Sequence, residues 1–308
     1  MRIIITGGTG LIGSALTLNL INDGNEVILL SRSLKPAKLL PVGTRIEKWD
    51  GKSAAGWGNL ADGCDAIVNL AGESVAGKNL LSMRWTPERK KSILQSRLDA
   101  GKAVIDALEN VAKKTRVLVQ ASAVGYYGTF PDNPEIDESS KPGDDFLASV
   151  CQQWEASTTT VEDMGVRRII VRIGVVLSNQ EGALPRQILP FKFFLGGPIG
   201  DGKQCYPWIH IADVVGAIRF LIGHEDAAGI FNLTSPHPIN NAEFSQKLGQ
   251  IMKRPSFLPT PAIVFKTVFG EAASILIGGQ CAIPKHLLEI GYPYQYADIN
   301  GALGNLLT

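Results

Sequence analysis

Short apolar runs alternate along the first half of the chain with longer stretches of helical periodicity. The apolar runs predict strands over Arg2–Thr6, Glu26–Ser31, Arg45–Trp49, Ala66–Leu70, Arg116–Ala121 and Arg168–Ile173. Helical periodicity predicts helices over Leu11–Asn22, Pro87–Leu108 and Asp144–Asp163. Because strands that alternate with helices favour a parallel sheet covered on both faces, we expect an α/β fold with a doubly wound parallel sheet of the Rossmann type.

The pattern loosens after about residue 178, where glycine and proline become frequent. A helix is still predicted over Asp213–Ile222, a strand near Ile230–Leu233 and a helix from Asn241. We interpret residues 1–178 as a nucleotide-binding Rossmann domain, to which the segment of about residues 205–235 returns. Residues 179–308 are expected to form a second, smaller C-terminal mixed domain on the substrate side.

A glycine cluster lies between the first predicted strand and the first predicted helix. Its residues predict one contact surface for a dinucleotide: Gly7, Thr9, Gly10, Leu11, Ile12 and Gly13. Gly7 permits a tight turn, Gly10 lets the backbone approach a pyrophosphate, and Gly13 lets the helix pack closely on the sheet. The helix start adds free N–H groups and a partial positive charge. The alternative is a flexible turn, which the strand and helix on either side disfavour.

The segment after the second predicted strand indicates which dinucleotide is bound. An acid there would bond the ribose 2′-hydroxyl of NAD, whereas this chain has Ser31, Arg32 and Ser33. A guanidinium flanked by hydroxyls suits a 2′-phosphate, so NADP(H) is the expected cofactor; the alternative is a solvated surface arginine. The loop after the strand at Ala66–Leu70 is expected to pass beside the cofactor, with Leu70, Ala71, Gly72 and Glu73 as contacts.

Composition and charge exclude several other classes of function. The chain has 30 Lys and Arg against 29 Asp and Glu, a net charge of +1, so nothing points to a nucleic acid. No Lys/Arg-rich block and no long apolar stretch points to a membrane. Four widely spaced cysteines indicate neither a metal site nor a disulfide framework, and they fit a reducing compartment. We expect a cytoplasmic protein with a small-molecule substrate. These features are also compatible with a homo-oligomer.

Several motifs together resemble an extended short-chain dehydrogenase/reductase. They are ITGGTGLIG at the start, NLAGE at 69–73, QSR at 95–97, SAVGYYG at 122–128, VRIGVVL at 171–177 and FNLTSP at 231–236. In finer detail the chain is similar to an atypical, YfcH-like subgroup of NAD(P)-dependent epimerase family proteins, which carry a C-terminal domain of unknown function. This resemblance implies NADPH in the cleft, with further contacts from Arg97 and Val176.

The catalytic segment departs from the pattern of that superfamily. Typical members use a Tyr-x-x-x-Lys pair, and here Phe146 and Val150 stand at those two positions. The position of the catalytic Ser or Thr falls on Ala123, one residue after Ser122. Phenylalanine has no proton to give, and valine has no charge that would shift a pKa. Tyrosine-based hydride chemistry of the usual kind is therefore not expected.

Three hypotheses remain open. In the first, the protein is an oxidoreductase or acts like a nucleotide-sugar epimerase, with Ser122, Tyr126 and Tyr127 as the candidate catalytic residues. In the second it is a non-catalytic NADPH-binding sensor, and in the third an interaction protein that the nucleotide only stabilises. His210 is a weaker catalytic candidate and is more simply a core histidine bonded to backbone. Asp213 is expected to cap the following helix, and Arg172 to bond strand or loop carbonyls.

Overall fold

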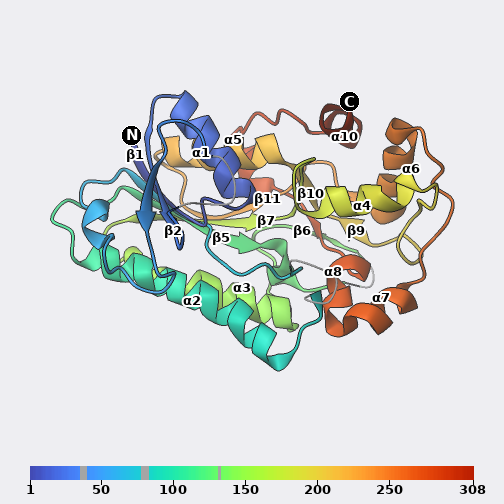
Figure 1. The fold of residues 1–308 in the computed structure, drawn as a ribbon, viewed down its shortest axis with the longest axis horizontal. Helices are drawn as coiled ribbons and strands as arrows, with labels where there is room; N and C mark the ends of the chain where they lie inside the picture. The colour runs from blue at the N-terminus through green and yellow to red at the C-terminus, as the bar shows by residue number, and fades with distance from the viewer. Residues whose placement is uncertain (35–39, 78–82, 131–132) are drawn as a thin grey trace.

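The computed structural model describes residues 1–34, 40–77, 83–130 and 133–308, and a seven-stranded parallel sheet runs through its centre (Figure 1). The strand order is β11-β7-β5-β4-β1-β2-β3. Its strands are β1 Arg2–Thr6, β2 Glu26–Ser31, β3 Arg45–Lys48, β4 Ala66–Asn69, β5 Val117–Ala123, β7 Arg167–Ile173 and β11 Gly229–Leu233. The predicted α/β class and parallel sheet are confirmed.

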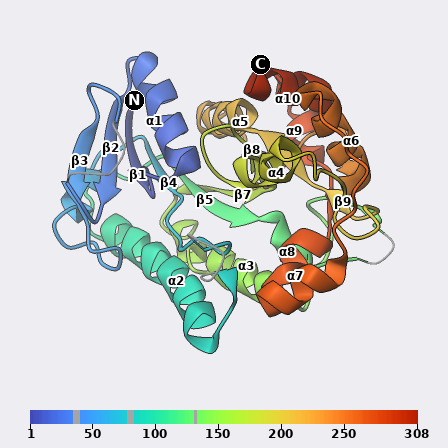
Figure 2. The same ribbon diagram turned by 45° about the vertical axis from the view of Figure 1, so that its right-hand side comes forward.

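Helices cover both faces of this sheet, as Figure 2 shows. The helices α1 (Leu11–Asn22) and α5 (Ile211–Gly223) lie on one face, and α2 (Pro87–Glu109) and α3 (Phe146–Ala156) on the other. Side chains alternate between the two faces along a strand. Accordingly Ile3 and Ile5 of β1 pack in one buried cluster with α1 and α5, whereas Ile4 packs with α2 on the opposite face.

The long predicted helix at 144–163 is shorter than expected. The helix α3 begins after Asp145, whose side chain accepts a hydrogen bond from the backbone N–H of Ala148, and ends at Ala156. There the Ser157 hydroxyl donates to the carbonyl of Trp154 at 2.7 Å and occupies the space that a side chain on Gly101 of α2 would need. The close approach of the two helices therefore stops α3 one residue before Ser157.

The second half of the chain forms smaller units around the carboxyl end of the sheet. The strand pairs are β8 Val175–Leu177 with β10 Trp208–His210, β9 Cys205–Tyr206 with β12 Ile239–Asn240, and β6 Glu135–Ile136 with β13 Cys281–Ala282. The helices are α4 Ala183–Lys192, α6 Asn241–Met252, α7 Ala262–Phe269, α8 Ser274–Ile277, α9 Lys285–Glu289 and α10 Ile299–Leu307. Short 3₁₀ turns are η1 Gly58–Ala61, η3 Val124–Tyr127, η4 Thr159–Val161 and η5 Gly270–Ala273.

Two of the cysteines form a disulfide, which corrects the expectation of isolated thiols. Cys205 of β9 and Cys281 of β13 are 76 residues apart in sequence, and their Cα atoms lie 5.2 Å apart. Gly279 permits this approach, because a Cβ atom there would lie 2.6 Å from the backbone nitrogen of Cys205. Cys64 and Cys151 are buried free thiols. Within the described ranges, no helix is both long enough and apolar enough to span a lipid bilayer.

Candidate functional site

The glycine cluster forms a tight backbone turn at the carboxyl end of β1. Gly7 has a left-handed φ of +66°, and a Cβ atom on it would lie 2.8 Å from the carbonyl carbon of Leu70. A Cβ atom on Gly13 would lie 2.5 Å from the carbonyl oxygen of Gly7. Both positions therefore require glycine, the first for its conformation and both for the close approach of backbone.

The start of α1 is open toward the sheet edge. Gly10 is the N-cap residue, and no side chain of the described residues caps this helix. A Cβ atom on Gly10 would meet only the carbonyl oxygen of Gly7, at 3.3 Å. A helix N-terminus with no capping side chain binds anions well. The turn therefore fits a pyrophosphate.

Three buried polar side chains hold the neighbouring loop in place. The Thr6 hydroxyl donates to Asn69 Oδ1 at 2.6 Å and accepts a hydrogen bond from the backbone N–H of Ala71 at 3.1 Å. Asn69 Nδ2 donates to Gln120 Oε1 at 2.9 Å. This chain of bonds joins the last residues of β1 and β4 to Gln120 in the middle of β5 and fixes the loop that begins at Leu70. Sequence reasoning missed it, although Thr6 and Asn69 are polar residues at the ends of their strands.

Arg97 of α2 is buried beside this loop. Its Nη1 donates to the carbonyl oxygens of Glu73 and Ile93 at 3.0 and 2.8 Å, and its Cζ lies 4.6 Å from the centre of the Trp154 ring. Its Nε has no hydrogen-bond partner, and burial lowers the pKa of the guanidinium. In the described residues Arg97 forms no ion pair, so this buried cation suits an anionic ligand group.

Glu73 itself is tied to α2. Its carboxylate forms an ion pair with Arg89 at 2.7 Å and accepts a hydrogen bond from the Ser92 hydroxyl. These hydrogen bonds, the Ser92 bond first, lower the pKa of Glu73 although the group is partly buried. A side-chain contact from Glu73 to a nucleotide would have to compete with these partners. Its backbone, with that of Gly72, remains the more suitable contact.

The remaining predicted cofactor contacts lie along the same edge. Ser31 ends β2, and its Oγ accepts a hydrogen bond from the N–H of Ser33 at 3.2 Å. Arg32 follows and is exposed. Across the turn, a Cβ atom on Gly182 would lie 3.2 Å from Leu11 and 3.7 Å from the carbonyl oxygen of Val176. The structure thus places Leu11 and Val176 on either side of one residue, at the open start of α1.

Ser122 and Tyr127 belong to a buried hydrogen-bonded network. The Ser122 hydroxyl donates to Glu155 at 2.6 Å, and Arg172 binds both oxygens of Glu155, at 2.8 and 2.9 Å. The Tyr127 hydroxyl accepts from Arg172 at 3.1 Å and donates to Asn232 Oδ1 at 2.8 Å. Arg172 was expected to bond carbonyls; it binds a carboxylate because α3 places Glu155 above β7. Burial raises the pKa of Tyr127 to about 12.

Tyr126 lies beside this network without joining it through a described hydrogen bond. Its ring is half-buried, and the Cζ of Arg172 lies 3.4 Å from the ring centre. The rings of Tyr126 and Tyr127 meet edge to face, with centres 5.4 Å apart. Stacking on a buried guanidinium orients the Tyr126 ring firmly. Of the three catalytic candidates, Tyr126 therefore has the least committed hydroxyl in the described part of the chain.

Phe146 and Val150 pack in an apolar cluster. The Phe146 ring lies 5.0 Å from that of Trp85, and Lys90 Nζ lies 4.8 Å above the Phe146 ring. Val150 is buried among Met83, Ile93, Phe269 at the end of α7, and Ala272 and Ala273 of η5. The end of α7 and the residues after it therefore cover the part of α3 that carries Phe146 and Val150.

His210 and Asp213 have structural roles at the start of α5. His210 is buried, and its Nδ1 accepts a hydrogen bond from the N–H of Ala212 at 3.1 Å, as expected for a core histidine bonded to backbone. His210 is thus the N-cap residue, which corrects the prediction for Asp213. The carboxylate of Asp213 instead accepts the N–H groups of Gln295 and Tyr296 at 2.7 and 2.9 Å, anchoring the segment that leads to α10.

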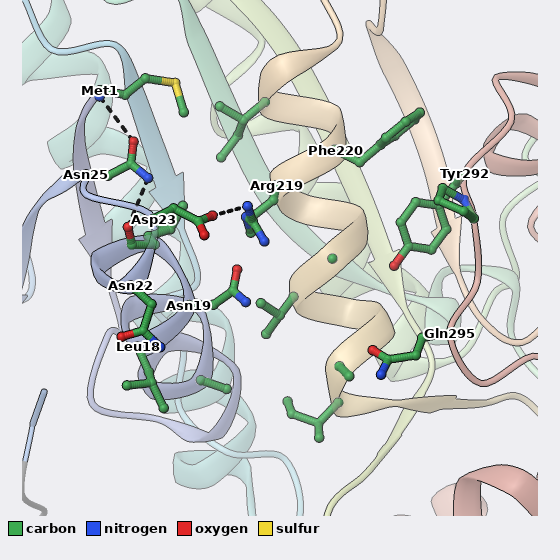
Figure 3. A pocket seen from close by; sticks show the side chains of 18 residues that line it. Met1, Leu18, Asn19, Asn22, Asp23, Asn25, Arg219, Phe220, Tyr292 and Gln295 are labelled. Carbon is green, nitrogen blue, oxygen red and sulfur yellow. Dashed lines mark hydrogen bonds and ion pairs between the residues drawn. The ribbon is translucent and has the colours of Figure 1, made fainter.

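A groove of about 800 Å³ lies elsewhere, between α1 and α5 (Figure 3). Figure 3 shows Asn19, Asp23 and Arg219 on facing helices, with an ion pair between Asp23 and Arg219. Asn22 and Asp23 are at the carboxyl end of α1, whereas the glycine turn is at its start. The lining of the groove begins on α1 at Ala15 and includes no residue of the glycine turn, so the groove is distinct from the proposed nucleotide site.

Comparison with known proteins shows the family to which the chain belongs. Residues 3–234 match the model of the NAD dependent epimerase/dehydratase family, and residues 260–306 match a domain of unknown function, DUF1731. The chain is 38% identical over 311 residues to the chloroplastic epimerase family protein SDR39U1 homolog of Arabidopsis thaliana, with 98% of this chain and 86% of that protein aligned. It is 35% identical over 308 residues to epimerase family protein YfhF of Bacillus subtilis, with 100% and 98% aligned.

A solved structure is similar over the same length. The crystal structure of human epimerase family protein SDR39U1 (isoform 2) with NADPH has a TM-score of 0.89 and 38% sequence identity, covering 99% of both chains. The structural similarity thus covers nearly the whole chain, including both the parallel sheet and the residues that follow it.

Proposed function

Because the chain belongs to the NAD-dependent epimerase/dehydratase family, we propose that it binds NADP(H) at the carboxyl edge of its sheet and acts on a small molecule as an atypical oxidoreductase or epimerase. The observation that carries this proposal is the glycine turn, whose backbone leaves the start of α1 open. The predicted contacts lie around that opening, from Ser31 and Arg32 through the loop at Leu70–Glu73 to Val176.

The preference for NADP(H) rests on charge. Ser31, Arg32 and Ser33 offer hydroxyls and a guanidinium where an acid would select NAD. The guanidinium can bond two phosphate oxygens at once. The human relative is described with NADPH, which agrees with this assignment. Arg97 supplies a second cation, buried and without a carboxylate partner in the described residues.

The chemistry would not use the usual acid–base pair. A bound nicotinamide supplies or accepts a hydride, and the protein must manage the accompanying proton. Ser122 and Tyr127 bond to Glu155, Arg172 and Asn232, so their hydroxyls are committed inside the protein. Tyr126 is the proton donor we propose, since its ring is fixed by Arg172 while its hydroxyl has no described partner.

A non-catalytic NADPH sensor is the second candidate function. It is favoured by the apolar cluster in which Phe146 and Val150 pack against Phe269, Ala272 and Ala273. That contact joins α3, which carries Phe146 and Val150 at the two positions of the usual tyrosine and lysine, to the end of α7 and the residues after it. Nucleotide binding could then alter a partner surface on that region without any turnover.

Calorimetric titration of the full chain with NADPH and NADH tests the binding. Arg32→Asp should weaken NADPH by about 10- to 100-fold, the value of one or two charge-assisted hydrogen bonds, and leave NADH nearly unchanged. Arg45→Asp is the matched control, because Arg45 is an exposed arginine on the adjacent strand β3. Equal losses for both coenzymes would show that Arg32 does not read the 2′-phosphate, and no binding of either would end the proposal.

Turnover separates the two candidate functions. Nicotinamide redox state is followed against a metabolite library with wild-type protein, Tyr126→Phe and Tyr127→Phe. Consumption that is lost in Tyr126→Phe and kept in Tyr127→Phe supports Tyr126 as the proton donor. Consumption that survives both changes rejects these tyrosines. If no metabolite is turned over while a protein partner is retained only with NADPH, the sensor function is favoured.

A further inference from the structure

Exposed apolar side chains gather on the outer side of the C-terminal region. We define the outer patch as the large apolar residues that three neighbouring segments leave exposed there: Phe193, Phe194, Leu195, Phe257, Leu258, Ile263, Val264 and Val268. Phe257 is 74% exposed, Phe193 67% and Ile263 66%. Single exposed apolar residues are ordinary, but a cluster of this size marks an interaction surface.

The three segments are joined to one another. The N–H of Leu258 donates to the carbonyl of Gly196 at 3.1 Å, and the N–H of Thr260 donates to that of Pro198 at 2.9 Å. The helix α7 begins directly afterwards, at Ala262. In Figures 1 and 2, α6 and α7 lie in the half of the molecule opposite β2 and β3, with α7 below α6. The backbones of the three segments that carry the outer patch are therefore adjacent.

The charged residues within the segments that carry the outer patch are all Lys or Arg. Lys192, Lys253, Arg254 and Lys266 are exposed, and Arg254 lies 4.4 Å from the ring centre of Phe194. No Asp or Glu occurs between Gly182 and Gly200 or between Phe244 and Gly270. None of the four cations forms an ion pair within the described residues. These charges are scattered in the sequence over three segments, which is why no basic block indicated a membrane.

Phe194 occupies a position where folding alone favours glycine. Its φ is +61°, in the left-handed region that bulky residues seldom adopt. It ends α4 in a Schellman motif, since the N–H of Phe194 donates to the carbonyl of Phe191 and the N–H of Leu195 to that of Pro190, each at 3.0 Å. Glycine is the usual residue there. An exposed phenylalanine held in this conformation indicates that its ring is needed on the surface.

We propose that the outer patch docks the protein on an anionic lipid surface, with the aromatic and aliphatic tips inserted between headgroups and the four cations on the lipid phosphates. Aromatic and aliphatic tips among Lys and Arg are typical of interfacial membrane binding. A second copy of the chain fits poorly, because a two-fold contact would place like charges opposite one another. The tips protrude, whereas a bound peptide helix would require an apolar groove.

Vesicle co-sedimentation of the full chain tests this proposal. We expect sedimentation with vesicles of phosphatidylcholine and phosphatidylglycerol, much less with phosphatidylcholine alone, and a decrease at high salt. Phe257→Asp should abolish sedimentation, and each of Lys253→Ala and Lys266→Ala should weaken partitioning about fivefold. Val42→Asp is the matched control, because Val42 is 96% exposed near β3, far from the outer patch, and should bind as wild type.

Phe194→Gly separates a docking role from a structural one. This variant should keep or raise Tm, because glycine adopts the left-handed conformation without strain, and yet weaken vesicle binding. Equal sedimentation with both vesicle types would overturn the proposal. So would a dimer in analytical ultracentrifugation that Phe257→Asp dissociates, since the outer patch would then be an interface between two copies. NADPH affinity should stay unchanged in every variant.

Discussion

Two parts of the carboxyl edge of the sheet, one at β1 and the other at β5 and β7, use their polar groups in opposite ways. Around β1 and α1 the backbone is bare, with Gly7, Gly10 and Gly13 leaving an uncapped helix start. Around β5 and β7 the side chains of Ser122, Tyr127 and Arg172 bond to one another or to Glu155 inside the protein. The first end is suited to a ligand from outside, and the second is satisfied without one. The open turn and the closed network are therefore separate features, and substitutions at each can be tested independently.

The largest expected effect comes from the buried ion pair. Glu155→Ala leaves Arg172, 1% exposed, without its carboxylate, so the free energy of unfolding should fall by about 3–5 kcal/mol. Urea denaturation followed by circular dichroism measures this loss. Glu26→Ala is the control, because the Arg2–Glu26 pair is exposed and should contribute at most about 1 kcal/mol. An equal loss of unfolding free energy in the two variants would contradict the conclusion that the polar side chains at β5 and β7 stabilise one another without a ligand.

A smaller effect is expected at the glycine turn. A Cβ atom on Gly13 would lie 2.5 Å from the carbonyl oxygen of Gly7, so Gly13→Ala must move the turn. We expect a loss of about 1–3 kcal/mol in unfolding free energy and a decrease of about tenfold or more in NADPH affinity by calorimetry. In the control Gly223→Ala, a Cβ atom meets nothing within 4 Å, and neither quantity should change appreciably. Unchanged NADPH affinity in Gly13→Ala would show that the turn does not hold the nucleotide.

Much of the nucleotide end could be predicted from the sequence, because its determinants are local. The strand Arg2–Thr6 and the helix Leu11–Asn22 have the predicted bounds, since an apolar run, a glycine turn and an amphipathic stretch follow one another within a few residues. The start of α2 is equally local, because Thr86 stands directly before Pro87 and its hydroxyl accepts a hydrogen bond from the N–H of Arg89.

The other end depends on tertiary register, which local patterns do not contain. Glu155 and Arg172 meet only because α3 packs on β5, whose neighbour β7 carries Arg172, and nothing in their spacing identifies them as partners. Cys205 and Cys281 come together through two short strands that are 76 residues apart in sequence. Asp213 looked like a helix cap, yet it binds the backbone of Gln295 and Tyr296, which follow 80 or more residues later.

Tyr127 provides a milder test of the β5–β7 end. Tyr127→Phe removes two hydrogen bonds and should cost about 1–2 kcal/mol of unfolding free energy at neutral pH. Burial raises the pKa of Tyr127 from 10.0 to about 12, so the unfolded state loses this proton before the folded state does. The stability that Tyr127 contributes is therefore complete below pH 10 and is lost as the pH rises toward 12.

Urea titrations at several pH values measure that difference. Between pH 10 and 12 the stability of Tyr127→Phe should fall less steeply than that of the wild type. Parallel curves would indicate that Tyr127 titrates normally and faces solvent. Tyr206→Phe is a suitable control: burial also raises the pKa of Tyr206, whose hydroxyl bonds to Gln187 away from the cleft. It should show the same alkaline trend, with any turnover unaffected.

The smallest effect on stability, and the sharpest for the comparison, is expected from Gly10→Ala. A Cβ atom on Gly10 meets only the carbonyl oxygen of Gly7, at 3.3 Å, so the unfolding free energy should stay within about 0.5 kcal/mol of wild type. The added methyl group nevertheless lies at the uncapped start of α1, where the pyrophosphate is proposed to bind, and NADPH affinity should fall. Wild-type affinity in this variant would move the nucleotide away from the helix start. A loss of affinity without a loss of stability would show that the open backbone is kept for the ligand and not for the fold.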